Sequence, residues 1–288
     1  MYKKRIAKRV VVIGSKGFVG SSICKILQKN NITFLEISRN DVNFDKDDAL
    51  AKLSNLINEE DFIIIAAAQA PVKNNKMLLD NISMMNIIIN SISEKSVKRV
   101  VYISSDAVYS DSKSHLNENS AVEPQSLHGI MHLTREIMLK QINNIQLSII
   151  RPTLIYGNKD PHNGYGPNQF FRLAQSNKNI RLFGKGEELR DHVSIDDVAQ
   201  LTVDLTLSNF EGVLNIASGK VKSFKEVAIL IKNLYRNKIN VLQTQRVGEM
   251  PHGGYRSFDI SKLHNLYPNF KITNLEDGMT KYFNKLNE

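Results

Sequence analysis

Short apolar runs alternate with longer amphipathic stretches along the first half of the chain. The runs RVVVIG (9–14), ITFLEIS (32–38), DFIIIAAA (61–68), RVVYISS (99–105) and QLSIIRP (146–152) are rich in Val and Ile. Such runs are typical of strands buried on both faces, and the stretches between them have helical spacing. Strands that alternate with helices predict an α/β fold, in which a doubly wound parallel sheet is built by right-handed crossovers.

The alternation weakens after Arg151, where Gly, Pro and Asn become frequent in YGNKDPHNGYGPN (156–168). This change predicts a smaller second lobe. The run GVLNIAS (212–218) predicts one further strand, which returns to the sheet. The organisation that we expect is a first domain over 1–155, joined by 191–220, and an interleaved C-terminal lobe made of 156–190 and 221–288.

Length and composition exclude several classes of protein. The chain has 288 residues, 42% hydrophobic and 23% charged, which predicts an ordinary globular protein with a substantial core. No apolar run reaches the roughly 18 residues of a membrane-spanning helix, and the basic start MYKKRIAKRVVVIG is unlike a signal peptide. The lone cysteine, Cys24, excludes a disulfide framework and predicts a cytoplasmic location.

The net charge of +9 could indicate a nucleic-acid partner, but its distribution favours small anions. The chain has 38 basic and 29 acidic residues, and the leader alone holds Lys3, Lys4, Arg5, Lys8 and Arg9. Without these five, 33 basic residues face 29 acidic ones, and no basic stripe is interleaved with aromatic residues. We therefore expect neither a nucleic acid nor a membrane as partner.

A glycine-rich loop links the first predicted strand to the first predicted helix. It reads Gly14-Ser15-Lys16-Gly17-Phe18-Val19-Gly20. Glycine permits a tight turn and a close backbone approach to a pyrophosphate, and the helix that follows offers free N–H groups and the positive end of its dipole. In this position the loop predicts a Rossmann-type dinucleotide-binding domain.

The end of the second predicted strand bears on the choice between NAD(H) and NADP(H). An acidic residue usually holds the ribose hydroxyls about 20 positions after the glycines, but Ser38-Arg39 stands there. The cations of Arg39 and Lys16 suit a ribose 2′-phosphate, which favours NADP(H). Alternatively both are surface charges and Glu36 binds the ribose, as NAD(H) would require. The next residues, Asp41-Val42, are expected to contact the adenine.

Five segments occur in an order that resembles the extended short-chain dehydrogenase/reductase family, whose epimerases, dehydratases and ketoreductases act on nucleotide sugars. They are GSKGFVG (14–20), DFIIIAAA (61–68), RVVYISSDAVY (99–109), RPTLIYG (151–157) and LFGKGEELRDHVSIDDVA (182–199). The opening stretch is most similar to that of GDP-fucose synthases, which are NADPH-dependent reductases. The resemblance therefore supports NADP(H) as the cofactor and a nucleotide-diphosphate sugar as the substrate.

The same resemblance implies roles for residues outside the glycine loop. Ala66, Ala67 and Ala68 are expected to line the cofactor, and Asn81 to support the cofactor and active site, the alternative for Asn81 being a helix cap. Members of the family commonly dimerise through the helices that correspond to 77–95 and 126–143, so a homodimer is expected.

The family's catalytic Ser or Thr, Tyr and Lys are matched only in part. The resemblance implies that Ser105 hydrogen-bonds the sugar oxygen at the carbon that exchanges hydride, the alternative being a cap of the strand end. The family's YxxxK motif reads His128-Gly129-Ile130-Met131-His132 here. An imidazole is partly protonated at pH 7, so His128 is the expected proton donor. Two nearby cations would repel, so one histidine is expected to be neutral, with His132 orienting His128 or reaching the cofactor ribose.

Three interpretations of this histidine pair remain open: a working enzyme, an impaired or repurposed enzyme, and a metal site. Two His at this spacing can bind zinc, but no HExxH motif or nearby cysteine supplies further ligands, so no metal is expected.

The second lobe carries the residues that the resemblance assigns to the substrate. Arg190 and Arg246 match two arginines that clamp the diphosphate, a task suited to a bidentate guanidinium. Asn168 stands where the family contacts the diphosphate, although a neighbouring family asparagine is Leu154 here.

The expected reaction is reduction of a nucleotide-linked 4-keto-(6-deoxy)hexose by NADPH. Ser105-Asp106-Ala107 lacks the acidic pair that the family's dehydratases carry, so water elimination is disfavoured. One alternative is a nucleotide-sugar 4-epimerase that oxidises and re-reduces the same carbon on a retained NAD. Another is a catalytically silent dinucleotide-binding protein that acts as a sensor or scaffold.

Overall fold

The computed structural model describes residues 7–157, 159–236 and 238–287, so Lys3, Lys4 and Arg5 of the basic leader lie outside the described residues. The chain divides into two compact units. The first consists of Met1–Ser110, Ala121–Pro152 and Val198–Leu214, and the second of Asp111–Ser120, Thr153–Asp197 and Asn215–Glu288. Less of the chain returns to the first unit than the expected 191–220, because β8 (Leu189–Ser194) pairs with strands of the second unit.

A six-stranded sheet forms the centre of the first unit, in the order β2-β1-β3-β4-β5-β9. The strands are β1 (Arg9–Ile13), β2 (Phe34–Ile37), β3 (Asp61–Ile65), β4 (Arg99–Ile103), β5 (Gln146–Pro152) and β9 (Gly212–Ile216). The pairs from β2 to β5 are all parallel. Every residue of β4 is buried, as expected for a strand covered on both faces. The predicted doubly wound α/β fold and the returning strand are therefore confirmed.

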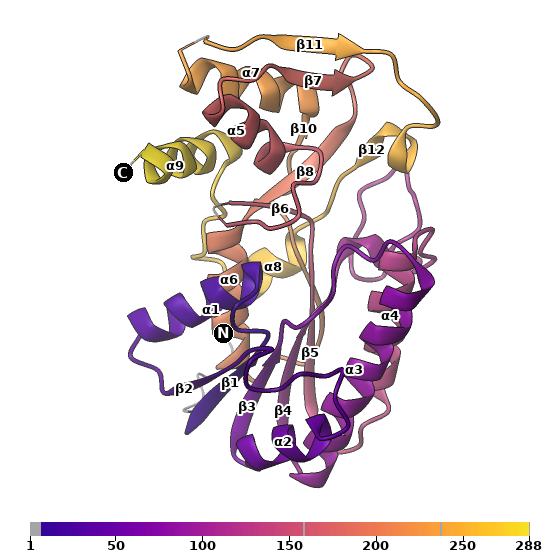
Figure 1. Cartoon of the computed structure of the whole chain (residues 1–288), viewed down its shortest axis with the longest axis vertical. Coiled ribbons are helices and arrows are strands. Elements are labelled where there is room, and N and C mark those ends of the chain that lie inside the picture. The colour runs from indigo at the N-terminus through magenta and orange to yellow at the C-terminus, as the bar shows by residue number, and fades with distance from the viewer. Residues whose placement is uncertain (1–6, 158, 237, 288) are drawn as a thin grey trace. The chain divides into compact units, whose positions relative to one another are not determined.

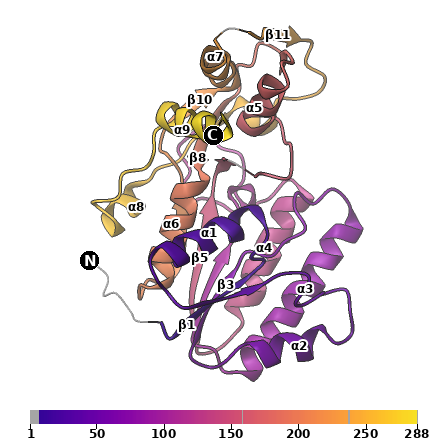
Figure 2. The ribbon, with the colours of Figure 1, turned by 60° about the vertical axis from the view of Figure 1, so that its left-hand side comes forward.

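Helices cover both faces of this sheet. They are α1 (Phe18–Lys29), α2 (Ala49–Leu56), α3 (Asn75–Glu94), α4 (Leu127–Lys140) and α6 (Ile195–Thr206), and a short 3₁₀ turn, η1 (Asp106–Val108), follows β4. Helices α2, α3 and α4 pack together on one face, and α1 and α6 lie on the other (Figures 1 and 2). Met85, Ile88 and Ile92 of α3 are fully buried in the core between that layer and the sheet.

The second unit contains shorter strands and four helices among its described residues. Its strands are β6 (Leu154–Tyr156), β7 (Ile180–Phe183), β8, β10 (Val221–Ser223), β11 (Val241–Thr244) and β12 (Tyr255–Arg256). Its helices are α5 (Pro167–Gln175), α7 (Phe224–Leu234), α8 (Ser261–Leu266) and α9 (Leu275–Asn287), with a 3₁₀ turn, η2 (Pro251–Gly254). Phe170, Phe171 and Phe224 lie in its own apolar core.

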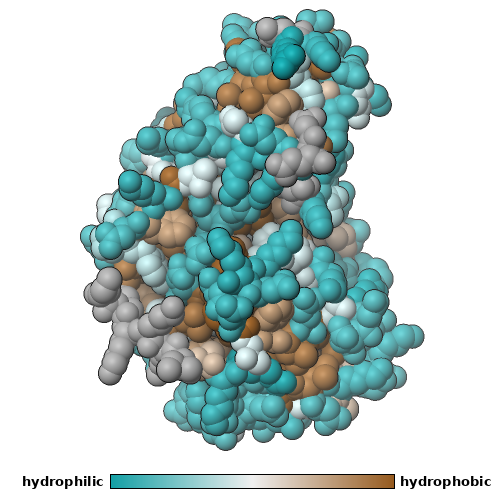
Figure 3. Space-filling model, turned by 90° about the vertical axis from the view of Figure 1, so that its left-hand side faces the viewer, coloured by the Kyte–Doolittle hydropathy of each residue, from teal (hydrophilic) through white to brown (hydrophobic). Residues whose placement is uncertain are grey.

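On the face shown in Figure 3, hydrophilic side chains dominate and apolar ones gather in limited patches. Among the described residues, no helix combines the length and the apolar character that a membrane span requires.

Candidate active site

The glycine loop after β1 is shaped by close backbone approaches. Gly14 has φ 92°, and a Cβ there would lie 2.6 Å from the Ala67 nitrogen. A Cβ on Gly20 would lie 2.1 Å from the Gly14 carbonyl oxygen, so only glycine lets α1 pack this closely on the loop. Helix α1 begins after Gly17 with no side-chain cap and no acidic residue in its first turn. Its first N–H groups and its dipole therefore fit the pyrophosphate of a dinucleotide.

A pocket of about 260 Å³ opens beside this loop in the first unit. Eight of the predicted cofactor residues line it: Gly14, Lys16, Gly17, Ser38, Arg39, Ala66, Ala67 and Ala68. Asn43, Phe44, Asp45 and Gln69 line it as well, and these four were not predicted. Phe18, Val19 and Gly20 lie in the first turn of α1, where backbone N–H groups face the loop side of the helix.

Both predicted phosphate ligands carry a carboxylate partner in this structure. The Lys16 ammonium lies 2.5 Å from Glu36, and the Arg39 guanidinium lies 2.5 Å from Asp45. The hydrogen bond to Glu36 raises the pKa of Lys16. Exposed ion pairs of this kind contribute little to stability, so a bound anion could replace either carboxylate at low cost.

Three other predicted cofactor residues act on the shape of the pocket. The Asp41 carboxylate accepts hydrogen bonds from the Ser38 nitrogen and hydroxyl, which lower its pKa, and Val42 is fully buried in the core. Neither lines the pocket, because the turn after β2 presents the next residues, Asn43 and Phe44, instead. Asn81 is buried within α3 and binds the Gln69 backbone through both its oxygen and its nitrogen. It thereby holds the loop that carries the alanines and is not a helix cap.

Helix α4 is fixed to the sheet by a buried ion pair. Arg151 of β5 donates two hydrogen bonds, of 2.9 and 2.6 Å, to the Glu136 carboxylate, and both side chains are almost fully buried. The Ser104 hydroxyl donates to the same carboxylate over 2.6 Å. Ser104, which directly follows β4, and Arg151 of β5 are thus both bound to the carboxylate of Glu136 in the middle of α4.

Ser105 and His128 come from two elements that touch. The Ser105 hydroxyl caps η1 by accepting a hydrogen bond from the Ala107 nitrogen at 3.1 Å. A capping interaction directly after β4, the alternative role for Ser105, is therefore present. A Cβ on Gly129 would lie 2.1 Å from the Ala107 carbonyl oxygen. Gly129 therefore lets α4 pack directly on η1, which brings the neighbouring His128 to the turn that begins at Ser105. His128 is half-buried at the start of α4.

His132 lies deeper than His128 and has a phenol as its partner. The two imidazole rings meet edge to face with centroids 4.7 Å apart. His132 Nδ1 lies 2.8 Å from the hydroxyl of Tyr102 on β4. Burial, followed by His128 and Arg135, lowers the pKa of His132 well below its usual range, so His132 is the neutral member of the pair. His132 is not among the residues that line the dinucleotide pocket.

The predicted substrate residues all lie in the second unit. Arg190 on β8 donates to the Glu188 carboxylate at 3.1 Å. Arg246, which follows β11, donates to the Phe183 carbonyl oxygen at 3.2 Å. The Asn168 side chain accepts from the Gly157 nitrogen and donates to the Ile155 carbonyl, so it fixes the turn after β6. Arg190 lies on β8 whereas Arg246 follows β11, and their side chains share no bonded partner among the described residues.

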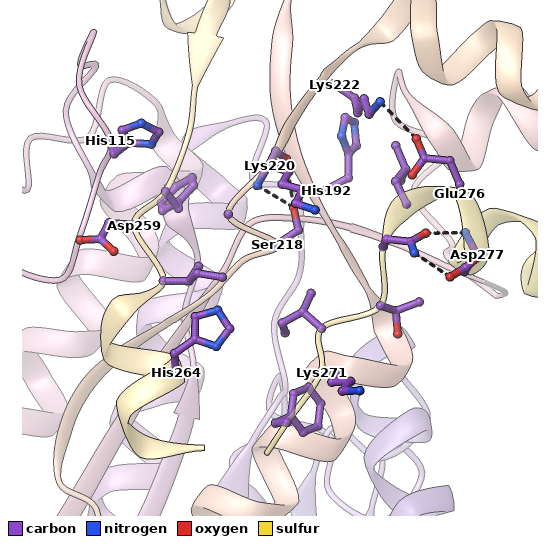
Figure 4. Close-up of a pocket in the computed structure, with 18 of the residues that line it drawn as sticks. His115, His192, Ser218, Lys220, Lys222, Asp259, His264, Lys271, Glu276 and Asp277 are labelled. Atoms are coloured by element: carbon purple, nitrogen blue, oxygen red, sulfur yellow. Dashed lines mark hydrogen bonds and ion pairs between the residues drawn. The ribbon is translucent and has the colours of Figure 1, made fainter. Parts of the chain in front are cut away.

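A larger cavity of about 1090 Å³ also lies in the second unit, and none of these three residues lines it (Figure 4). Its acidic residues have partners within the unit: Asp259 with Ser261, Glu276 with Lys222 and Asp277 with Asn274. Burial lowers the pKa of His192 on its wall to about 3. No group of three or more metal-ligating side chains occurs in the part of the chain that the structure describes.

Tyr102, Arg135 and the Glu136–Arg151 pair are site residues that the sequence alone did not single out as such. Arg135 follows His132 by one helical turn, so helical spacing places both on one face of α4. This spacing, together with the apolar run around Tyr102, is the sequence signal that could have identified these residues.

Known proteins share both the sequence pattern and the fold. A model of the NAD dependent epimerase/dehydratase family matches residues 10–217. Over 309 aligned residues the chain is 25% identical to an uncharacterized UDP-glucose epimerase of Bacillus subtilis, and the match covers 94% of this chain and 96% of that protein.

Two solved structures have the same fold. A GDP-L-fucose synthetase from Naegleria fowleri bound to NADP matches with TM-score 0.84 and 17% identity, over 99% of this chain and 95% of that one. A UDP-glucose 4-epimerase from Thermus thermophilus in complex with NAD matches with TM-score 0.81 and 20% identity, over 97% and 99%. The similarity expected from the five motifs is thus confirmed, and the chain belongs to the NAD dependent epimerase/dehydratase family, within the extended short-chain dehydrogenases/reductases.

Proposed function

We propose that this protein uses NADPH to reduce a nucleotide-linked 4-keto-(6-deoxy)hexose. The observation that carries the choice of cofactor is the placement of Lys16 and Arg39, which line the same pocket as the alanines after β3. Two cations at one mouth of a dinucleotide pocket suit a ribose 2′-phosphate. The chemistry that such a cofactor supplies when bound is hydride transfer to the sugar carbon.

The proposed roles of the chain's own residues follow from their burial and protonation. Among the described residues, the Ser105 hydroxyl donates to Asp106 over a long distance of 3.4 Å, so its proton can turn to the substrate oxygen. His128 is half-buried and neighbours a neutral imidazole, and it delivers the proton to that oxygen. Arg190 and Arg246 hold the diphosphate, which replaces their present partners, the Glu188 carboxylate and the Phe183 carbonyl oxygen.

A second candidate function is nucleotide-sugar 4-epimerisation on a retained NAD. The specific observation in its favour is that Glu36 and Asp45 neutralise Lys16 and Arg39, and Asp45 lines the pocket. A carboxylate at this place suits free ribose hydroxyls, as NAD carries. The UDP-glucose epimerase relative agrees with this candidate.

The deciding experiment compares the two cofactors and the two reactions on one preparation. The purified full chain is mixed with NADPH or NADH and a panel of nucleotide 4-keto-6-deoxysugars, and loss of reduced-cofactor absorbance is followed. In parallel, UDP-glucose is incubated with the protein and NAD, and UDP-galactose is measured. Turnover with NADPH supports the reductase. Interconversion without net cofactor consumption supports the epimerase, and tight dinucleotide binding without either reaction supports a sensor or scaffold.

Paired variants connect the activity to the proposed residues. His128→Phe is expected to lower kcat by about 100-fold or more, because it removes the proton donor and keeps the ring volume. His264→Phe, at an exposed position on α8, is the matched control and should leave kcat unchanged. Full turnover by His128→Phe would contradict the assignment of the proton donor.

We further propose that two copies associate through α3 and α4. These helices pack together, and Leu79, Ile130 and Ile137 on them are 64%, 40% and 50% exposed. Exposed apolar residues on adjacent helices favour contact with a second copy. Light scattering should give the mass of a dimer, and Ile137→Lys should shift it toward the monomer.

A further inference from the structure

The helix that lacks the family's lysine carries a buried cation one turn further along. Arg135 is fully buried in α4, and its Nη2 donates to the Ala67 carbonyl oxygen at 2.9 Å. Ala67 lines the dinucleotide pocket. The guanidinium therefore lies directly behind the loop on which the cofactor is proposed to bind.

Tyr102 connects this guanidinium to the histidine pair. The Arg135 guanidinium carbon lies over the Tyr102 ring, 5.2 Å from its centroid, as in a cation–π contact. The Tyr102 hydroxyl in turn contacts His132 Nδ1. A continuous set of contacts thus runs from the cofactor loop through Arg135 and Tyr102 to His132 and His128.

The charge of Arg135 is poorly compensated compared with other buried arginines. The adjacent Glu136 is bound by Arg151, and no carboxylate lies within ion-pair distance of Arg135 among the described residues. Its Nε has no hydrogen-bond partner in that part of the chain. Arg99, equally buried, donates to the Phe210 and Leu205 carbonyl oxygens and to further acceptors. Because an unpaired buried charge is costly, its presence beside a candidate site calls for a role.

We propose that Arg135 is a positioning residue which, together with Tyr102, replaces the missing lysine by keeping His132 neutral with its proton on Nε2, so that His128 alone exchanges a proton with the substrate. The inference rests on the proposed function for the role of His128. The neutral state and the tautomer of His132 are properties of the protein without substrate.

The tautomer follows from counting donors. Burial raises the pKa of Tyr102, so the phenol keeps its proton. Its hydroxyl has one proton, and Nδ1 of His132 is its hydrogen-bond partner. If Nδ1 carried the imidazole proton, the phenol proton would lack an acceptor in a fully buried place. The phenol therefore donates to Nδ1, and the neutral ring carries its proton on Nε2.

Few ionisable groups face His132 from the elements packed on its helix. The buried face of α3 carries only Asn, Met, Ile and Ser side chains. The groups that remain are His128, Arg135 and Glu136 on α4, Tyr102 on β4, Asp106 on η1 and Arg151 on β5. Glu136 is neutralised by Arg151, so Arg135 is the fixed cation acting on His132.

The test is a histidine titration by nuclear magnetic resonance on the full chain labelled with ¹⁵N-histidine. In the wild type, His132 is expected to stay neutral with the Nε2–H pattern across the range in which ordinary histidines titrate. Arg135→Met should raise the pKa of His132 by about 1 pH unit or more. Arg135→Lys should keep it low, because the charge is retained. Tyr102→Phe should remove the preference for Nε2–H.

The control is Arg99→Met, which deletes an equally buried arginine that donates to the Phe210 carbonyl oxygen and to the Ser148 hydroxyl. It should destabilise the protein without changing the His132 signals. A protonated His132 in the wild type near pH 7 would overturn the proposal. So would identical titrations for wild type and Arg135→Met, or for Arg135→Met and Arg135→Lys.

Kinetics supply an independent arm. In Arg135→Met, kcat should fall by about 10-fold or more while KM for the sugar nucleotide changes little, and Arg135→Lys should restore most of the rate. If no turnover is found with any substrate, the proposed function fails, but the titration still decides the role of Arg135. A changed KM with normal kcat would overturn the positioning role.

Discussion

Replacing Gly129 by alanine tests whether the packing of α4 on η1 sets up the proposed catalytic pair, Ser105 and His128. A Cβ at this position would lie 2.1 Å from the Ala107 carbonyl oxygen and 2.7 Å from Pro124 Cβ. Ordinary contact begins near 3.4 Å, so α4 and η1 must separate by about 1.3 Å at this point. Ser105 begins η1 and His128 precedes Gly129, so the separation acts directly on the distance between the two functional groups.

The size of the effect can be estimated for stability and for rate. Alanine is a better helix former than glycine by about 1 kcal/mol, whereas overpacking costs about 1–3 kcal/mol, so the free energy of unfolding should fall by only about 0–2 kcal/mol. A displacement of about 1 Å between reacting groups can cost about 100-fold in rate. We therefore expect Gly129→Ala to lose about 100-fold in kcat while it remains folded.

The assay combines three measurements on the variant. Turnover is followed by NADPH absorbance, dinucleotide affinity by titration, and stability by thermal unfolding. Dinucleotide affinity should stay at the wild-type value, because neither Ala107 nor Pro124 lines that pocket. Gly164→Ala is the matched control, since a Cβ there meets no atom within 4 Å. A Gly129→Ala protein with near-normal kcat would refute the view that Ser105 and His128 act as a closely spaced pair.

Three further changes test other parts of the structure. Glu136→Gln should lower the free energy of unfolding, measured in urea, by about 3–5 kcal/mol, because it leaves Arg151 buried without its carboxylate. Glu60→Gln, in the exposed pair with Lys8, should lower it by less than about 1 kcal/mol. Asn81→Leu should weaken dinucleotide binding, measured by titration, because the Gln69 backbone loses both of its side-chain partners. For His192, the folded pKa of about 3 lies below that of the unfolded chain, so the unfolded state takes up the proton first as the pH falls. As the pH falls from about 6.5 to 3, wild type should therefore lose stability relative to His192→Phe, at up to about 1.4 kcal/mol per pH unit. Melting temperatures that change with pH in the same way for both proteins would contradict this.

The sheet could be predicted from the sequence because its pattern is local. The strands β1, β3 and β4 each contain a continuous apolar run, and the burial of every β4 residue is the physical cause of its run. The glycine loop could also be predicted from the sequence, because close backbone approaches around one strand–turn–helix segment require Gly14 and Gly20. Spacing along the chain is enough for inferences of this kind.

Contacts between residues far apart in the sequence could not be predicted from such local patterns. In the sequence Arg135 looks like an ordinary helix-surface charge, and only the packing of α4 on the sheet shows that it is buried against the Tyr102 ring. The expected adenine contacts at Asp41-Val42 depended on where a turn leaves β2, and the hydrogen bonds of Asp41 to Ser38 move the pocket-lining positions on by two residues. Neither the register of α4 nor the course of that turn is encoded in a periodic pattern.

The cofactor choice shows most clearly why a list of charges does not determine a ligand. Lys16 and Arg39 were identified as cations at the right places, but their partners Glu36 and Asp45 become visible only in three dimensions. The proposed preference for NADP(H) is then a difference between two paired states: the cations with a phosphate, or the cations with carboxylates. Because each exposed pair contributes little to stability, a doubly charged phosphate that engages both cations can outweigh the two carboxylates. The advantage is electrostatic, so the ratio of NADH to NADPH dissociation constants should fall as salt is raised; a ratio independent of salt would mean that Lys16 and Arg39 do not bind the phosphate.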